Sequence, residues 1–235
     1  MFLIIDKKML ITISLILSII PMFSAGIYAL TQDKSDEISV LIDPGHGEPD
    51  GGCVGALGSI EQEINLNVAR KTAEILVAKN ITAHLTRTSS LGLWSEKSTT
   101  IREKKLEDMK NRRKIMENSN CQLFISIHMN SYPSPSASGI RIFYDKNHED
   151  IRELCEQIQA RMSDVTGAKT AQVKPADRTL FLMKDTPMPA ILIECGFLTS
   201  PKEEQNLMDS VYRSKLAWAI ADACEKYFIA NKINQ

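Results

Sequence analysis

Short apolar runs alternate with longer amphipathic stretches from residue 38 onward, and this alternation limits the folds open to the chain. Five runs have the length and composition of buried strands: Ile38–Asp43, Ile81–Thr86, Gln122–His128, Gly139–Tyr144 and Ala190–Glu194. Helical patterns occupy residues 60–79, 101–118, 148–165 and 210–229. Strands that alternate with helices are joined by crossovers, which favour parallel pairing. The sequence therefore predicts an α/β fold, with a mainly parallel central sheet and helices on both faces, in a single domain over residues 38–232.

The composition fits this prediction and narrows the function classes. At 235 residues, with 43% hydrophobic and 24% charged residues, the chain can bury one sizeable core. Its formal net charge of -1 shows no basic excess, which argues against nucleic acid as the main partner. No CxxC pair is present, and the spacing of the five cysteines favours unpaired, partly buried thiols: Cys53, Cys121, Cys155, Cys195 and Cys224.

The amino terminus has the pattern of an export signal. Lys7 and Lys8 precede an uncharged stretch, residues 9–32, that is rich in Leu and Ile. Small residues between Ser24 and Ala29 lie where a signal peptidase would cut, yet the stretch is also about long enough to span a bilayer. Residues 1–30 are therefore predicted to be either a signal peptide or a membrane anchor, and 31–37 a polar linker. We expect an exported protein that meets the membrane only through this segment.

Two of the four histidines end apolar strand patterns. His46 follows VLIDPG and His128 follows LFISI, whereas His84 lies within a strand pattern and His148 at the start of a helical one. The carboxyl ends of strands in an open parallel sheet are where sites assemble. His46 and His128 are therefore expected to meet at one edge of the sheet, and this favours a metal site.

A catalytic zinc commonly takes three protein ligands and leaves a position for water. Near His46 the acidic candidates for the third ligand are Glu48, Asp50, Glu61 and Glu63, and Glu61, which opens a helical pattern, ranks only slightly above Glu63. A hydrolytic site also needs a base. Glu194 ends the apolar run AILIE, where a carboxylate is costly to bury unless it is paired or used.

Four motifs together resemble the zinc-dependent N-acetylmuramoyl-L-alanine amidases of the amidase-3 type. They are DPGHG, IEQEINLNVA, SIHMN and ILIECGFLTSPKEE, in the family's order, and the match runs from about Ile38 to Phe228. The resemblance implies that His46, Glu61 and His128 bind zinc and that Glu194 is the catalytic residue. It also implies structural or substrate-positioning roles for Arg87 and Arg112.

The resemblance implies hydrolysis of the amide between the lactyl group of muramic acid and L-alanine in peptidoglycan. In that mechanism Glu194 takes a proton from the zinc-activated water and passes it to the departing amine. Gly45 and Gly47, which lack β-carbons, are expected to allow the backbone turn and close approach of the substrate.

Within the family the chain looks most like the sporulation members, because it is short and has one apolar amino-terminal segment, no added wall-binding domain and the loop SIHMNSYPSPSASG. This implies action at the forespore envelope, where removal of the stem peptide precedes formation of the muramic-δ-lactam of spore cortex that germination enzymes read. It also makes a spore lipoprotein partner of the GerS type plausible for a clostridial protein.

Three alternatives remain open from the sequence. One is a vegetative autolysin or cell-separation amidase with the same core. A second is an inactive wall-binding protein on the same fold. The third is a cysteine hydrolase that uses Cys195, which would leave the convergence of Glu61 with both histidines unexplained.

Overall fold

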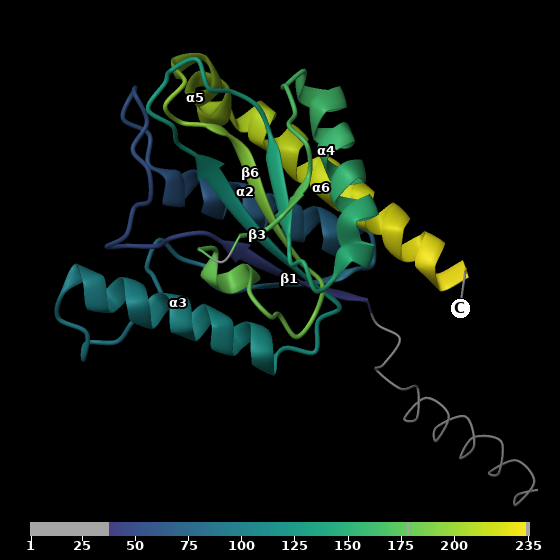
Figure 1. Cartoon of the computed structure of the whole chain (residues 1–235), viewed down its shortest axis with the longest axis horizontal. Helices are drawn as coiled ribbons and strands as arrows, with labels where there is room; N and C mark the ends of the chain where they lie inside the picture. The colour runs from purple at the N-terminus through teal and green to yellow at the C-terminus, as the bar shows by residue number, and fades with distance from the viewer. Residues whose placement is uncertain (1–37, 178, 234–235) are drawn as a thin grey trace, which may run out of the picture. The chain divides into compact units, whose positions relative to one another are not determined.

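A computed structural model describes residues 38–177 and 179–233 of the chain (Figure 1). The predicted leader, residues 1–30, and the predicted linker, 31–37, lie outside the described residues. Each helix in the described part of the chain is too short or too polar to cross a membrane.

The core of the fold is a six-stranded sheet with the order β2-β1-β3-β6-β4-β5. Its strands are β1 (Ser39–Pro44), β2 (Thr82–Leu85), β3 (Leu123–Asn130), β4 (Arg141–Tyr144), β5 (Lys174–Pro175) and β6 (Ala190–Phe197). All neighbouring strands pair in parallel except β4 and β6, which are antiparallel. The mainly parallel sheet and its five predicted strands are confirmed. Strand β5 was not predicted, because two residues are too few to show a periodic pattern.

The described helices are α2 (Glu61–Ala78), α3 (Ile101–Asn118), α4 (Arg152–Thr166), α5 (Pro201–Met208) and α6 (Ser210–Ile233), with short 3-10 turns η2 (Glu149–Ile151) and η3 (Phe181–Met183). The four predicted helices are confirmed. The start of α3 is fixed by a capping box, in which Thr100 and Glu103 satisfy each other's backbone N–H groups. Helix α5 was not predicted, because its eight residues are largely polar.

Helices cover both faces of the sheet, as predicted. On one face α2, α4 and α6 pack over alternate strand residues such as Val40 and Ile125. On the other face α3 and η3 pack over the residues in between, such as Leu41 and Phe124. Figure 1 shows α3 apart from the other long helices, across the sheet. Because the central strands are buried on both faces, they are mainly apolar until they end.

The order of the strands decides which side chains can meet. Strands β1, β3 and β6 are neighbours, and His128 on β3 lies opposite Glu194 on β6. Between these residues and the next pair, Asn130 and Phe197, strand β6 has one residue more than β3, which is a β-bulge. His46, His128 and Glu194 are thus delivered to the same carboxyl edge of the sheet.

Candidate metal centre and active site

The loop after β1 carries His46, and its backbone is held by two buried arginines. His46 has a φ of 61°, which is uncommon for a residue with a side chain. Arg112 donates through Nη1 to the carbonyl of Pro44 (2.7 Å) and through Nη2 to that of His46. Arg87 donates through Nη2 to the carbonyl of Gly45 (3.0 Å). Three successive carbonyls are thereby fixed, so in this structure both arginines position the loop.

Asp43, at the end of β1, anchors Arg112 beneath the loop. Its carboxylate is fully buried and accepts hydrogen bonds from Arg112 Nη1 (2.6 Å), Thr86 Oγ1 (2.6 Å) and Ser126 Oγ (2.7 Å). Burial opposes ionisation of Asp43, but the charge of Arg112 and the two hydroxyl hydrogen bonds hold the pKa of this carboxyl below its usual range. A paired buried charge thus fixes the base of the site.

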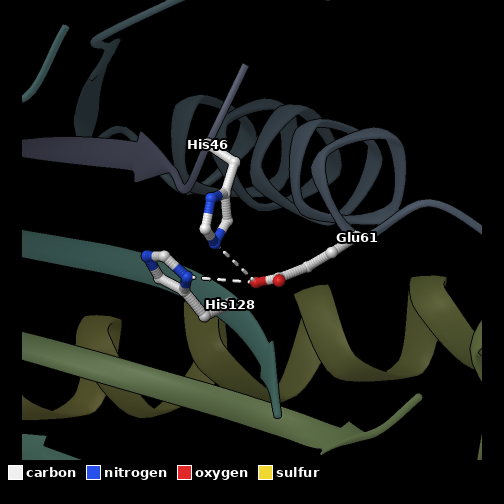
Figure 2. Close-up of side chains that lie close together, drawn as sticks. All are labelled: His46, Glu61 and His128. Atoms are coloured by element: carbon white, nitrogen blue, oxygen red, sulfur yellow. Dashed lines mark hydrogen bonds and ion pairs between the residues drawn. The ribbon is translucent and has the colours of Figure 1, made fainter. Parts of the chain in front are cut away.

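His46, Glu61 and His128 converge on one point (Figure 2). Glu61 Oε1 lies 3.3 Å from His46 Nε2 and 3.1 Å from His128 Nδ1. The centroids of the two imidazole rings are 5.0 Å apart, and the ring planes are inclined at 74°. Within residues 38–177 and 179–233 these three side chains form the one cluster of His, Cys, Asp or Glu whose donor atoms are close enough to share a metal ion, all within 4.8 Å of one another.

Glu61 is held rigidly as the first residue of α2. Its Oε2 accepts a hydrogen bond from the backbone N–H of Cys53 (2.8 Å), and its Oε1 accepts from that of Met129 (3.1 Å) and from Asn65 Nδ2 (3.3 Å). Glu61 is buried with 3% of its surface exposed, so these bonds fix where its carboxylate lies.

The other three acidic candidates are placed differently. Glu48 and Glu63 are exposed. Asp50 accepts a hydrogen bond from His46 Nδ1 (3.0 Å) and forms an ion pair with Lys105 (3.0 Å). It therefore orients the imidazole through the ring nitrogen that faces away from Glu61. Among these candidates Glu61 is the one that lies between the two histidines.

The charges of the cluster favour a cation at its centre. Burial lowers the pKa of His46, but hydrogen bonds with Asp50 and Glu61 raise it to about 9. Burial also opposes ionisation of Glu61, yet its contacts with His128 and His46 hold the pKa of that carboxyl well below its usual range. The carboxylates of Asp50 and Glu61 therefore place negative charge around the histidines, which favours a cation at the centre of the cluster.

Glu194 lies at the same edge of the sheet but makes no hydrogen bond through Oε2, which is buried. Burial raises the pKa of Glu194 to about 7, although the charge of His128 opposes this rise. A carboxyl group poised near neutrality without a partner is suited to accept and return a proton.

The glycines near His46 make room chiefly for the site's own side chains. A Cβ on Gly45 would lie 2.2 to 2.6 Å from three atoms of the His128 ring, and one on Gly52 would lie 2.4 Å from Glu61 Oε2. Gly45 was expected to allow close approach of the substrate, but the ring of His128 fills the space beside it. Gly47 does serve the predicted turn, with a φ of 149°.

A cavity of about 230 Å³ opens beside His46 and His128. It lies between Met109 on α3 and the segment Thr179–Met183, and Leu192 contributes to its lining. A wider hollow of about 690 Å³ lies elsewhere, between the start of β1 and the end of α3, and contains none of the clustered residues. Of these two hollows, the smaller is the one that His46 and His128 line.

The sequence did not lead us to the residues that hold the clustered side chains in place. Asn65 and Asp43 were not singled out, although a polar residue on the buried stripe of a helix and a carboxylate in a buried strand are signals of the same kind as Glu194.

The prediction of unpaired, partly buried cysteines is confirmed for all five. Cys195 is fully buried, and burial raises the pKa of its thiol far above the usual range, which disfavours a cysteine nucleophile.

Comparison with known proteins places the chain in a family. Residues 40–226 match the family Amidase_3, N-acetylmuramoyl-L-alanine amidase. The chain therefore belongs to the N-acetylmuramoyl-L-alanine amidases, enzymes that act on peptidoglycan, and the resemblance of its four motifs to that family is confirmed.

Three similar proteins show which members of the family the chain resembles. The chain is 32% identical over 189 residues to the germination-specific N-acetylmuramoyl-L-alanine amidase of Bacillus subtilis, across 80% of this chain and 79% of that protein. It is also similar to the CwlD amidase from Clostridioides difficile, solved in complex with the GerS lipoprotein, with a TM-score of 0.79 and 36% identity over 83% of this chain and 100% of that one. The N-acetylmuramoyl-L-alanine amidase LytC of Bacillus subtilis is 30% identical over 81% of this chain but 35% of its own length.

Proposed function

We propose that this amidase holds a zinc ion with His46, Glu61 and His128 and uses Glu194 as the base that hydrolyses the muramoyl–L-alanine amide. The observation that carries the proposal is the position of Glu61 Oε1, 3.1 Å and 3.3 Å from one nitrogen of each histidine. Two imidazoles with one carboxylate are a common donor set of catalytic zinc.

The residues present fit zinc, because each histidine turns one ring nitrogen toward the centre of the cluster. His46 turns Nδ1 to Asp50 and leaves Nε2 toward the centre, whereas His128 turns Nδ1 toward it. Zinc held there supplies a Lewis acid for the amide carbonyl and makes water acidic enough to attack at neutral pH.

Glu194 supplies the proton transfers. Its unpartnered Oε2 is available to take the proton of the attacking water, and the same oxygen then returns that proton to the departing amine of L-alanine. Burial raises the pKa of Glu194 above its usual range, which brings this carboxyl closer to a group that can both accept and return a proton near neutral pH.

Single replacements test the ligand set. His46→Ala, Glu61→Ala and His128→Ala are each expected to lower bound zinc and abolish hydrolysis, with zinc measured by mass spectrometry of the folded protein. Glu63→Ala, an exposed acid two residues from Glu61, is the matched control and is expected to keep both. Full zinc content in His128→Ala would remove that residue from the site.

We further propose that the enzyme acts outside the cytoplasmic membrane during sporulation, in the formation of cortex muramic-δ-lactam. The similarity to a germination-specific amidase and to CwlD supports this role, and the leader-like residues 1–30 support export. Expression in a Bacillus subtilis strain that lacks its germination-specific amidase is expected to restore muramic-δ-lactam to the cortex, whereas His128→Ala is expected to restore none. A wild-type chain that reaches the envelope and leaves the lactam absent would favour the vegetative role.

A lipoprotein partner of the GerS type is part of this proposal, supported by the CwlD structure solved with GerS. The measurement is the zinc content of the purified chain with and without such a lipoprotein. Binding that leaves zinc content and activity unchanged would argue against a functional partnership.

A further inference from the structure

Glu204 on α5 is a buried carboxylate that the proposed chemistry does not use. It has no exposed surface, and the hydrogen bonds that the structure shows to its carboxylate come from neutral groups. Its Oε2 accepts a hydrogen bond from the backbone N–H of Leu57 (2.7 Å), and its Oε1 accepts from the N–H (3.1 Å) and hydroxyl (2.6 Å) of Ser59. Burial opposes ionisation, but these hydrogen bonds hold the pKa of Glu204 below its usual range. These hydrogen bonds therefore compensate the cost of burying the charge, and they tie α5 to the loop that carries Leu57 and Ser59.

The loop that Glu204 holds, residues 53–60, leads directly to Glu61. Its two ends close on each other, because the N–H of Glu61 donates to the carbonyl of Cys53 (3.0 Å) and Glu61 Oε2 accepts from the N–H of Cys53 (2.8 Å). The tip of the loop lies tightly on α5, since a Cβ on Gly55 would be 2.0 Å from Glu204 Oε1. A shift of the tip is therefore transmitted to the hydrogen bond that orients the Glu61 carboxylate.

We propose that Glu204 is a positioning residue for zinc binding, which acts by holding loop 53–60 so that Cys53 orients Glu61. This inference rests on the proposed zinc site. It assigns a role to α5, a helix that contributes no side chain to the cluster of His46, Glu61 and His128. Outer residues that orient metal ligands typically contribute about 10–100-fold to metal affinity.

Glu204→Gln is the main test, because glutamine keeps the shape but turns an NH₂ group toward the N–H of Leu57 or Ser59. We expect the dissociation constant for zinc, measured by competition with a chromophoric chelator, to rise about 10–100-fold. Activity is expected to recover when zinc is raised to saturation, since all proposed ligands remain.

Glu203→Gln is the matched control on the same turn of α5. Glu203 accepts hydrogen bonds from the N–H groups of Gly139 and Phe197 (2.8 Å each) and none from loop 53–60. Its replacement removes the same charge and is expected to leave the zinc dissociation constant within about threefold of wild type. An equal loss of zinc affinity in both variants would overturn the proposal, because the effect would then follow from the charge of α5.

Ser59→Ala keeps the proposal testable if Glu204→Gln does not fold. It removes the single bond from Ser59 Oγ to Glu204 and is expected to weaken zinc binding in the same direction, by less. If Glu204→Gln folds and its zinc affinity equals that of the wild type, the role of Glu204 is overturned. If Glu204→Gln is unfolded, wild-type zinc affinity in Ser59→Ala overturns it. A wild-type chain that binds no zinc would instead refute the proposed zinc site.

Discussion

Gly45→Ala offers a sharp test of the site, because it adds one methyl group at a position where the structure leaves no room. The new Cβ would lie 2.2 Å from His128 Cε1, 2.3 Å from Nε2 and 2.6 Å from Nδ1, whereas ordinary contacts begin at 3.4 Å. The imidazole must therefore retreat by about 1.2 Å, the difference between 3.4 and 2.2 Å. Gly45 does not have a positive φ, so alanine there brings no backbone strain of that kind.

A retreat of this size is large for a metal ligand. Metal–ligand distances tolerate about 0.2 Å, so a displaced His128 would no longer complete the proposed site. We expect zinc affinity to fall at least 100-fold and activity to fall by about 10²-fold or more. Overpacking typically costs about 1–3 kcal/mol, which is less than the usual stability of a domain, so the variant is expected to remain folded.

The assay measures three quantities on the same preparation: the zinc dissociation constant, peptidoglycan hydrolysis and the thermal unfolding temperature. Gly51→Ala is the matched control in the same loop, because its Cβ would meet only the flexible side chain of Ile60, at 3.0 Å. The reasoning is refuted if folded Gly45→Ala binds zinc within about threefold of wild type, since His128 would then not need its observed place.

Three further predictions concern the base, the buried charge and the thiols. Glu194→Gln is expected to bind zinc normally and to lose turnover by about 10²–10⁴-fold in an assay of released stem peptides; near wild-type turnover would make this glutamate structural, and loss of zinc would place it among the ligands. Because the pKa of Asp43 is lower in the folded protein than its usual 3.8, its contribution to stability is present above that value and is lost as the pH falls through the folded pKa. Asp43→Asn should therefore flatten the dependence of the unfolding free energy on pH below about 4, as measured by urea titration, and an unchanged slope would contradict this assignment. Iodoacetamide is expected to leave Cys195 of the native enzyme unlabelled because this thiol is fully buried, whereas inactivation through labelling of Cys195 would revive the cysteine mechanism.

The fold was largely predictable from local patterns. The strands β1, β3 and β6 are mainly apolar on both faces, and α2 repeats its apolar residues about every four positions. These patterns predict strands and a helix, respectively. Helix α5 and strand β5 could not be found in this way. They are short and polar, and tertiary contacts such as those of Glu203 and Glu204 hold α5 in place.

The site was predictable in part, and the limit has a physical cause. Strand ends indicated His46, His128 and Glu194, because a parallel sheet brings such ends together. Glu61 and Glu63 could not be ranked clearly by position alone, since both lie in the first turn of one helix. Folding separates them: Glu61 turns inward onto the N–H groups of Cys53 and Met129, and Glu63 is exposed.

Two of the supporting contacts were not accessible from the sequence. That the ring of His128 lies on Gly45 depends on the pairing of β1 with β3. That α5 holds the loop before Glu61 depends on a contact between residues 145 to 147 positions apart in the chain. Contacts of this range leave no periodic pattern, and a single sequence carries no sign of them.

The most direct test of the zinc amidase is mass spectrometry of purified peptidoglycan after incubation with the enzyme, together with metal analysis of the same sample. The account predicts one zinc per chain and stem peptides released with a free L-alanine amine. It also predicts that both are lost on chelation and that both return when zinc is added. Release of the same peptides by a chain without zinc, or cleavage at another bond by the zinc-loaded chain, would contradict it.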